Sequence, residues 1–360
     1  MQFSWAEPNE VERIRSIAGQ QGVQYVHHKV RRKPVPAFGA YLTMIMGASK
    51  IKSYAKENGI QVLMPRSTMP AMMVNHIQSW IRENNIKMIF DADGLPIEER
   101  VDFAGLKPNS LQHKWLKKTE TQTLLQADLV ITRTQKAIDY HLEHIGDAHR
   151  YKFFKVSNGR DPKIFKPDQS GRQKIRSKMG IVPTDFLWVY TGTLGSAYKL
   201  DEMIALFDRY HQSAKGSRFL FLTRNDGYLA GKIPSHLKNA IIIKTVPFEE
   251  VPCYLAAADL GLSLRKQAPS LAGLAPIKIG EYLLSGLPVI ASPGVGDTEV
   301  ILSNQPACFL YTDKSQFETF LPWIRTLEKI DRNNIRTLGL NYFNLNQTIN
   351  EYLKVLQTLP

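Results

Sequence analysis

The 360-residue chain has only two cysteines, no long apolar run and fewer acidic than basic residues. Cys253 and Cys308 are far apart, so neither a disulfide framework nor a cysteine-rich zinc site is indicated. No apolar stretch approaches the roughly 20 residues that a membrane-spanning helix requires. The first residues also lack the charged start and apolar core of a secretory signal. We therefore expect a protein of a reducing cytoplasm that does not cross a membrane.

Several familiar catalytic motifs are absent as well. The turn GTLG at Gly192 lacks the third glycine of a dinucleotide fingerprint, and no G-x-x-x-x-G-K-[ST] phosphate loop occurs. There is no H-E-x-x-H pair and no G-x-S-x-G elbow. His141 and His144 share one face of an expected helix, where we expect surface positions. Dehydrogenases, P-loop enzymes, zinc proteases and elbow-type hydrolases are therefore unsupported, and we expect neither a metal ion nor a cofactor.

What the sequence does have is positive charge. Lysine and arginine number 46 against 33 acidic residues, which gives a net charge of +13. Such a balance favours an anionic partner: nucleic acid, an acidic membrane face or a phosphate-bearing substrate. Basic clusters lie at residues 29–33 (KVRRK), 114–118 (KWLKK) and 163–178. Each cluster alone is typical of a solvated surface, but together they favour an anionic surface nearby.

Strand and helix patterns alternate through the first part of the chain. Compact apolar runs such as KMIF and DLVIT, separated by helical patterns, indicate a parallel sheet covered on both faces. Only a short apolar piece at 2–5 precedes the first helical pattern, so one strand of a doubly wound domain is expected to be missing. We expect strands at 23–27, 60–65, 86–91, 128–132 and 152–156, and helices at 10–21, 41–58, 70–84, 111–126 and 135–144.

A linker rich in Pro, Gly, Asp and Lys begins at Ser157, and a second alternating set follows it. We expect strands at 186–190, 218–223, 240–244 and 259–264, and helices at 199–211, 248–257, 317–329 and 346–359. The pattern predicts an α/β protein of two Rossmann-like domains, 1–160 and 161–340. The last helix, in 341–360, is expected to cross back to the first domain. A ligand is then expected in the cleft between them.

The stretch from Pro269 to Gly296, PSLAGLAPIKIGEYLLSGLPVIASPGVG, combines a small-residue loop, a helix, a strand and a glycine turn. Backbone N–H groups of the loop and the helix N-terminus can approach an anion, and Glu281 can accept hydrogen bonds from a vicinal diol. Together these features suit a nucleoside diphosphate. The same helix–glycine–strand pattern is equally typical of any α/β protein, so the pattern alone leaves both readings open.

Basic side chains follow several strands of the second half. Lys199 lies one turn beyond the TGTLGS turn, and Arg224 and Arg265 each follow an expected strand. In an open parallel sheet the ligand sits beyond the carboxyl ends of the strands, so these cations can converge on one diphosphate. Arginine and lysine are also common after strands in general, so any single member carries little weight.

Longer segments resemble a known family. The run PIKIGEYLLSGLPVIASPGVGDTEV, from Pro276 to Val300, resembles the donor-binding signature of retaining glycosyltransferases of family four, which have the GT-B fold. FDADGLPIEERVDFAG resembles the centre of their acceptor domain in a bacterial polysaccharide branch. KVSNGRDPKIFKP resembles their interdomain segment, and VYTGTLGSAYKLDEM resembles the first strand, turn and helix of their donor domain. The resemblance covers the chain from about Val23 onward.

The resemblance implies roles for individual residues. Glu281 would bind the ribose hydroxyls of a nucleotide-sugar, Lys199 would neutralise the diphosphate, and the loop at 272–275 would approach phosphates and sugar. Asp93 would orient the acceptor or act as base, with Glu98 and Glu99 as alternatives, or it simply caps the turn DADG. Our catalytic candidates are Asp93, Lys199 and Arg224. Our donor-binding candidates are Gly192, Thr193, Arg265, Gly273, Leu274, Lys278 and Glu281, and those on the acceptor side are Arg66, Gly94 and Glu98.

The sequence departs from the family pattern at three positions. Gly273 stands where the first of two glutamates is usual, Thr193 where many members have an arginine, and Asp93 where many have a histidine before the glycine. Arg224 or Arg265 can substitute for the arginine. These departures bear on the sugar and on the catalytic group more than on nucleotide binding.

The leading hypothesis is a cytoplasmic glycosyltransferase of polysaccharide or glycolipid assembly, working with retention at the inner face of the membrane. Its partners would be a nucleotide-sugar donor, a glycan or lipid-linked acceptor and an anionic membrane surface. Two alternatives remain: a nucleotide-sugar 2-epimerase of the same fold, or a non-catalytic protein that binds anions or nucleic acid. Nucleic acid is disfavoured because no basic stripe with interleaved aromatics is present.

Overall fold

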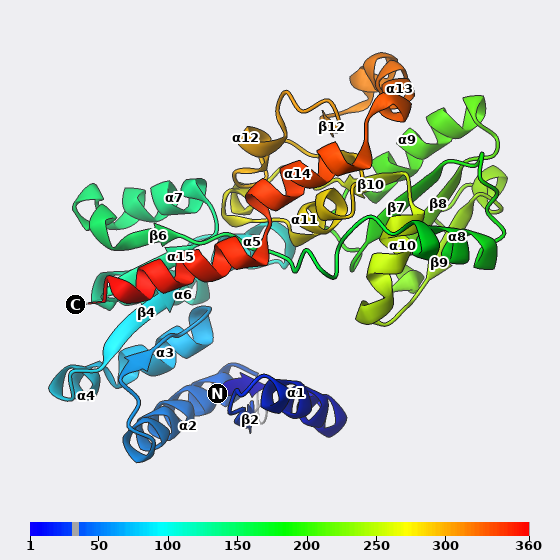
Figure 1. The fold of residues 1–360 in the computed structure, drawn as a ribbon. Coiled ribbons are helices and arrows are strands. Elements are labelled where there is room, and N and C mark those ends of the chain that lie inside the picture. Colours follow the sequence, from blue (N-terminus) through cyan, green and yellow to red (C-terminus); the bar gives the residue numbers. More distant parts are fainter. Residues whose placement is uncertain (31–35, 360) are drawn as a thin grey trace.

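The computed structural model describes residues 1–30 and 36–359, which form two α/β lobes joined side by side (Figure 1). Three residues of the basic cluster KVRRK, Arg31, Arg32 and Lys33, lie outside the described part. Within the described part, no helix combines the length and apolar character needed to cross a bilayer. The two lobes correspond to the two sets of alternating strands and helices in the sequence.

The N-terminal lobe contains a four-stranded parallel sheet of order β3-β4-β5-β6. Its strands are β3 (Val62–Leu63), β4 (Lys87–Asp91), β5 (Leu129–Thr132) and β6 (Phe153–Lys155). Two further strands, β1 (Gln2–Ser4) and β2 (His27–Lys29), pair with each other in parallel as a separate sheet. The strand expected at 23–27 is therefore displaced toward the C-terminus, because the pairing with β1 begins only at His27.

Helices surround both sheets of this lobe. Their bounds are α1 (Pro8–Gln20), α2 (Pro36–Glu57), α3 (Thr68–His76), α4 (Gln78–Glu83), α5 (Pro96–Phe103), α6 (Leu111–Gln126) and α7 (Gln135–Ile145). The bounds expected for α6 are confirmed; Ser110 caps it by accepting a hydrogen bond from the His113 amide. The single helix expected at 70–84 is wrong, since the chain breaks at Ile77 into α3 and α4. Helix α5 was not expected from the sequence; it begins at Pro96, two residues after the turn at Gly94.

The C-terminal lobe is built on a six-stranded parallel sheet of order β12-β11-β10-β7-β8-β9. Its strands are β7 (Leu187–Thr191), β8 (Arg218–Leu222), β9 (Ile241–Lys244), β10 (Leu260–Ser263), β11 (Val289–Ala291) and β12 (Cys308–Leu310). Along β7, Leu187 and Val189 enter one apolar cluster, while Trp188 and Tyr190 enter another on the opposite face. A strand buried on both faces is what the continuous apolar runs predict.

Helices cover both faces of this second sheet. They are α8 (Gln169–Lys178), α9 (Leu200–Ser213), α10 (Val251–Ala257), α11 (Ile277–Leu284), α12 (Thr298–Leu302), α13 (Phe317–Thr326) and α14 (Arg332–Tyr342). Helix α8 occupies part of the stretch interpreted as linker. Its sequence, QSGRQKIRSK, has too few apolar residues to show a helical period, but Asp168 caps it and Ile175 enters the core.

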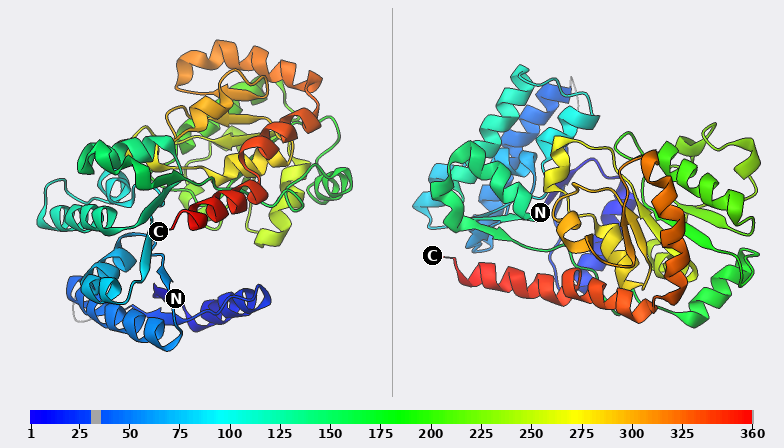
Figure 2. Two further views of the ribbon diagram at one scale, coloured as in Figure 1. Left: turned by 60° about the vertical axis from the view of Figure 1, so that its left-hand side comes forward. Right: turned by 90° about the horizontal axis from the view of Figure 1, so that it is seen from above.

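The last helix, α15 (Leu345–Gln357), returns to the N-terminal lobe and lies along it (Figure 2). Val355 packs with Ile89, Ile131 and Val156 in one apolar cluster, and Tyr352 adjoins this cluster. The chain thus passes between the lobes twice. At the crossing, the Arg160 amide donates to the Phe343 carbonyl at 2.7 Å and the Leu345 amide donates to the Arg160 carbonyl at 3.0 Å.

Candidate functional site

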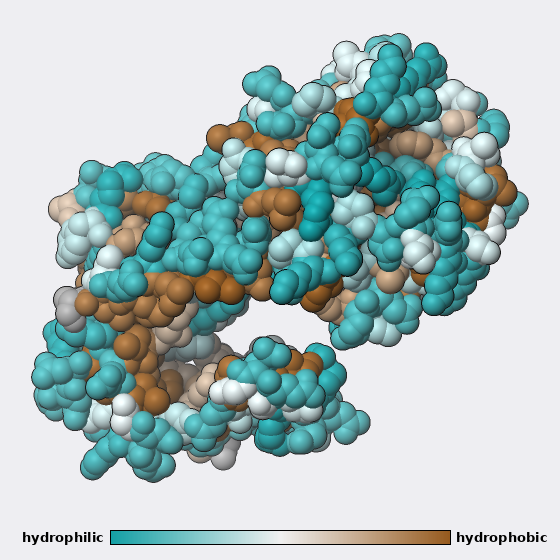
Figure 3. All heavy atoms as spheres, viewed as in Figure 1, coloured by the Kyte–Doolittle hydropathy of each residue, from teal (hydrophilic) through white to brown (hydrophobic). Residues whose placement is uncertain are grey.

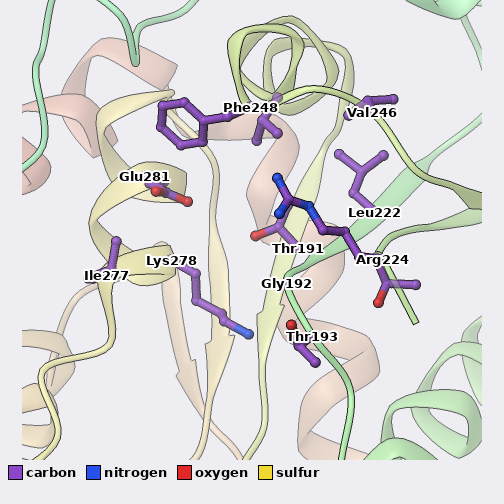
Figure 4. Close-up of a pocket in the computed structure, with 12 residues that line it drawn as sticks. Thr191, Gly192, Thr193, Leu222, Arg224, Val246, Phe248, Ile277, Lys278 and Glu281 are labelled. Carbon is purple, nitrogen blue, oxygen red and sulfur yellow. The ribbon is translucent and has the colours of Figure 1, made fainter. Parts of the chain in front are cut away.

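Two cavities meet at the first turn of α11. One, of about 360 Å³, lies beyond the ends of β7 and β8 in the C-terminal lobe (Figure 4). The other, of about 340 Å³, lies between the lobes, where Asp93 and Gly94 face the loop around Gly273. Ile277 and Lys278 line both cavities, so the two are parts of one continuous site.

The floor of the first cavity is the turn that follows β7. Gly192 has φ +110, a backbone conformation that favours glycine, and a Cβ added there would be in ordinary contact with Lys278 Nζ at 3.5 Å. Asn225 fixes the turn from the end of β8: its Oδ1 accepts from the Leu194 amide at 2.9 Å, and its Nδ2 donates to the Leu194 carbonyl at 2.6 Å. Gly192 and Thr193, both donor-binding candidates from the sequence, line this cavity.

Lys278 is a buried lysine at the junction of the two cavities. Its Nζ is shielded from solvent and has no hydrogen-bond partner among the described residues. It lies 4.1 Å from the ring centre of Tyr190 and 4.6 Å from that of Tyr198. Burial, reinforced by repulsion from Arg265 and opposed by Glu281, lowers the pKa of Lys278 to about 7. A buried ammonium without a partner is unusual, and an anion placed beside it would satisfy it.

Two arginines complete the basic lining. Arg224 is exposed at the end of β8, and Figure 4 shows its guanidinium group extending over the first cavity. Arg265, after β10, lines the second cavity and donates from Nη2 to the Tyr198 hydroxyl at 3.0 Å. Its Nη1 is buried without a partner in the described part of the chain. Three cations from three separate elements therefore face one continuous space.

Glu281 lies one turn after Lys278 and also lines the first cavity. Arg160, from the segment between the lobes, donates from Nε to Glu281 Oε1 at 2.9 Å. Burial raises the pKa of Glu281 against the opposing influence of Arg160 and Lys278. Figure 4 shows the carboxylate pointing toward the cavity. It can therefore accept further hydrogen bonds from a ligand.

At Gly273 the two lobes approach each other closely. A Cβ at this position would lie 2.7 Å from Leu95 N and 2.8 Å from Gly94 C. The contact is reinforced nearby, because the Thr134 hydroxyl donates to the Ala272 carbonyl at 2.7 Å and the Ser270 amide donates to Asp102 Oδ2 at 3.0 Å. The glutamate that the family pattern puts here would collide with the backbone of the opposite lobe.

Asp93 lies on the N-terminal side of the second cavity, held by two arginines. Arg133 Nε donates to Asp93 Oδ1 at 3.0 Å, and Arg66 Nη2 contacts Oδ2. Arg133 also binds both oxygens of the buried Asp91, at 2.8 and 2.9 Å, and lies over the ring of Tyr352 from α15. These contacts fix the Asp93 carboxylate in place through side-chain partners.

Some predicted residues lie elsewhere. Lys199 does not line either cavity; its Nζ donates to the Thr312 carbonyl at 2.6 Å and pairs with Glu202 at 3.2 Å. Glu98 is buried behind the site, where Lys117 Nζ donates to its Oε1 at 3.0 Å. Arg66 does not line either cavity, but it contacts Asp93, which lines the second one. Gly94, Leu274 and Arg265 are brought together in the second cavity.

The expectation that His141 lies at the surface is wrong. Only 1% of the residue is exposed, because α7 turns it inward beside Phe153. Burial, together with the nearby charges of Lys117 and His144, lowers the pKa of His141 to about 3. Among the described residues, no group of three or more His, Cys, Asp or Glu side chains is placed to hold a metal ion.

The sequence reasoning missed three contributors. Arg160 lies within the interdomain segment already singled out, and Arg133 directly follows β5, where the rule for strand ends would have found it. Tyr198 carries no such signal, since its role depends on the approach of Lys278 and Arg265 from two other elements.

Comparison with known proteins agrees with this architecture. No family model and no curated protein matches the sequence. Solved structures do match: HepE of Anabaena in complex with UDP has a TM-score of 0.73 at 16% identity, covering 99% of this chain and 91% of that chain. A glycosyltransferase of Rickettsia africae has a TM-score of 0.69 at 15% identity, covering 99% and 90%. The pneumococcal O-GlcNAc transferase GtfA has a TM-score of 0.58 at 12% identity, covering 86% and 60%.

The chain has the GT-B fold. This confirms the predicted class of two α/β domains with parallel sheets on either side of a cleft. Within the GT-B fold, the first cavity lies wholly in the C-terminal domain, and the second lies between the domains. At these levels of identity the likeness establishes the fold, so function has to be argued from the residues of the two cavities.

Proposed function

We propose that the protein is a glycosyltransferase that moves a sugar from a nucleotide-sugar to an acceptor hydroxyl. The observation that carries this proposal is the unpartnered ammonium of Lys278, set where a cavity for the nucleotide meets a cavity between the domains. A nucleotide-sugar has its diphosphate between nucleoside and sugar, so a cation at that junction matches its charge distribution.

In this arrangement the nucleoside occupies the first cavity. The ribose hydroxyls bind Glu281, and the base lies toward Val246 and Phe248 at the far end of the same cavity. The diphosphate lies against Lys278, with Arg224 on one side and Arg265 on the other. HepE is described in complex with UDP and with UDP-glucose, and this supports the choice of uridine nucleotides as first probes.

The sugar then enters the second cavity, opposite Asp93. We propose transfer with retention: the bond between C1 and the diphosphate oxygen breaks, and the acceptor oxygen bonds to C1 on the same face. The departing diphosphate oxygen takes the acceptor proton. The three cations stabilise the charge that develops on the diphosphate, and one such preorganised group is worth about 3–4 kcal/mol. Asp93 orients the acceptor, and we expect no requirement for an added metal ion.

The acceptor is proposed to be a glycan or lipid-linked molecule at an anionic inner membrane face. Helix α6 supports this, because Leu111, Lys114, Trp115 and Lys118 follow helical spacing and are all exposed. Leu111 is 89% exposed and Trp115 is 44% exposed. An apolar and basic face of this kind suits the interface of an anionic bilayer.

A binding experiment tests the donor site first. A ligand at 100 times its Kd stabilises the folded state by about 2.7 kcal/mol, so UDP and UDP-glucose should raise the melting temperature in a thermal-shift screen. Glu281→Ala should lose most of this shift, whereas Glu202→Ala, on the far side of Lys199, should retain it. The donor site is refuted if no nucleoside diphosphate or nucleotide-sugar produces a shift and Glu281→Ala behaves as the wild type.

Product analysis tests the reaction itself. Incubation with the donor alone should leave the sugar configuration unchanged, and turnover should require an acceptor and persist with a chelator. Conversion of the donor without an acceptor would instead indicate an epimerase.

Sedimentation with vesicles containing anionic lipid tests the membrane proposal. Binding should weaken with salt and with the double substitution Leu111→Ser and Trp115→Ser. Val300→Ser, at an exposed apolar position in the other domain, should bind as the wild type. Absence of salt-sensitive binding would exclude the membrane surface.

A further inference from the structure

Arg265 forms no ion pair with a carboxylate in the described part of the chain, and its Nη1 is buried without a hydrogen-bond partner there. Two other arginines beside the cleft differ in this respect, because Arg133 and Arg160 each bind a carboxylate. A guanidinium presents N–H donors in a planar fork that matches a carboxylate or a phosphate. Arg265 therefore has donors left for an anion in the cavity that it lines.

Neutral groups fix Arg265 in position. Its amide donates to Ser292 Oγ at 2.9 Å, and Ser292 Oγ donates to its carbonyl at 3.0 Å. Its guanidinium lies 4.7 Å from the ring centre of Tyr198, and Nη2 donates to the Tyr198 hydroxyl. A side chain that is already oriented loses little rotamer freedom when it binds a ligand. Arg265 is thus a preorganised cation whose charge is not neutralised.

The second cavity has two unlike walls. On the wall from the C-terminal domain, the charged residues among those described are Arg265 and Lys278, both basic. On the opposite wall they are Asp93 and Glu99. Two arginines already hold Asp93, and Glu99 is exposed, so that solvent screens its charge. An anionic group in this cavity is therefore favoured along the C-terminal wall.

The next step rests on the proposed function and counts charges along the donor. The diphosphate of an intact nucleotide-sugar carries two negative charges. In the first cavity, Lys278 and Arg224 supply two positive charges, whereas Glu281 is already paired with Arg160. Arg265 lines the second cavity and not the first. It therefore leaves a positive charge on the side of the sugar, which a neutral hexose does not balance.

We propose that the sugar of the donor is a uronic acid and that Arg265 binds its carboxylate. A uronic acid differs from the corresponding hexose only at C6, where a carboxylate replaces the hydroxymethyl group. That carboxylate can accept two parallel N–H···O bonds from a guanidinium. Asn158 also lines the cavity, and its neutral amide suits the sugar hydroxyls. The carboxylate takes no part in bond breaking, so Arg265 selects the donor without changing the transfer step.

The outer surface divides polar from apolar character in a compatible way. Figure 3 shows hydrophobic atoms along the opening beside the N-terminal domain, whereas the face of the C-terminal domain seen there is mostly hydrophilic. A donor with three negative charges suits the hydrophilic domain, and the apolar part of a lipid-linked acceptor suits the other.

Calorimetry on the full chain at pH 7.5 tests the proposal with UDP, UDP-glucose and UDP-glucuronate. UDP-glucuronate should bind at least about tenfold more tightly than UDP-glucose, the lower limit for a hydrogen bond to a charged group. UDP-galacturonate against UDP-galactose repeats the comparison for the other configuration at C4. Arg265→Gln should bind both members of a pair about equally. Because the ratio is taken within a pair, any contribution of Arg265 to the diphosphate cancels.

Arg224→Gln is the matched control, since Arg224 lines the first cavity and not the second. It should weaken both members of a pair by the same factor and keep their ratio. Should Arg265→Gln not fold, Arg265→Lys takes its place. Lysine keeps the charge but not the planar fork, so the preference should fall, and an unchanged preference would count against Arg265.

Two results would overturn the proposal. The first is neutral donors that bind the wild type as tightly as the uronic acids in both pairs. The second is a preference for the uronic acid that persists in Arg265→Gln. Normal binding of UDP in either case would leave the proposed donor site intact, whereas failure of UDP itself to bind would refute that site and this proposal together.

Discussion

Replacing Lys278 by methionine should separate the charge of this side chain from its packing. Methionine keeps an unbranched apolar stem between Tyr190 and Tyr198 but removes the ammonium. A hydrogen bond to a charged group is worth about 1.5–3 kcal/mol, and every 1.4 kcal/mol is a factor of ten in affinity. We therefore expect the variant to bind UDP about 10- to 150-fold more weakly than the wild type at pH 7.

The same substitution should stabilise the empty protein. Unfolded lysine has a pKa of 10.5, against about 7 for Lys278 in the folded chain. The folded state therefore loses stability by holding this charge, fully so below about pH 7. Between about pH 7 and 10.5 the unfolded chain binds the extra proton, so this group makes stability rise with pH. At 1.36 kcal/mol per pKa unit the cost at neutral pH is on the order of a few kcal/mol, and Lys278→Met removes it.

Calorimetry in two buffers of different ionisation enthalpy measures the linked proton. One pH unit above its pKa, roughly nine in ten Lys278 side chains are neutral in the empty protein. A bound diphosphate restores the charge, so UDP binding at pH 8 should take up close to one proton, and at pH 6 almost none. Lys278→Met leaves Arg265, Glu281, Tyr190 and Tyr198, the other groups that face this position, in place. Lys278→Met should show no uptake.

Lys199→Met is the matched control, because the family resemblance assigns the phosphate to Lys199 while the structure directs that side chain to Thr312. It should bind UDP within about twofold of the wild type. The reasoning fails if Lys278→Met binds UDP normally with unchanged proton uptake. If Lys199→Met loses the affinity instead, the family pattern identifies the phosphate-binding lysine and the cavity geometry does not.

Three further substitutions test the packing around the site by urea or thermal unfolding. Gly273→Glu, which restores the family residue, should destabilise the domain contact by about 1–3 kcal/mol because its Cβ meets the Leu95 amide; wild-type stability would refute that contact. The wild type should lose stability as the pH falls from 6.5 toward 3, because the unfolded imidazole binds a proton that the folded one, with a pKa of about 3, does not. His141→Leu should remove this loss, and an unchanged pH profile would contradict the burial of a neutral imidazole. Lys117→Met should cost about 3–5 kcal/mol by leaving the buried Glu120 unpaired, more than at an exposed lysine such as Lys118.

Most of the fold follows from local patterns in the sequence. Apolar runs of strand length, separated by helical periods, predict two parallel sheets, and β4, β5, β7 and β8 lie within two residues of their expected bounds. Helix α8 shows the limit of this method. Its residues are mostly polar and contribute little apolar surface, so only its cap and its place against the core make it helical.

A site residue could be predicted from the sequence where it follows a strand or lies in the first turns of a helix, because these positions face the cleft in an open parallel sheet. Arg224, Arg265, Lys278 and Glu281 are of this kind, and all four line the cavities. Lys199 also follows this rule, yet its ammonium binds the Thr312 carbonyl, which comes from elsewhere in the fold, and the Glu202 carboxylate, which lies one turn along α9. Which partner such a side chain takes depends on tertiary distances that sequence spacing does not contain.

Helix α11 joins the donor site to the connection between the domains. Glu281 faces the cavity on one side and binds Arg160 on the other, where the chain passes from one domain to the next. One residue earlier, a Cβ at Gly280 would lie 2.8 Å from Phe343, whose carbonyl accepts from the Arg160 amide. In the proposed donor site, the nucleotide would therefore contact the same carboxylate that Arg160 binds. The backbone of Arg160 in turn bonds to Phe343 and Leu345 at the second crossing, so the proposed ribose site and the contact between the two crossings share one ion pair.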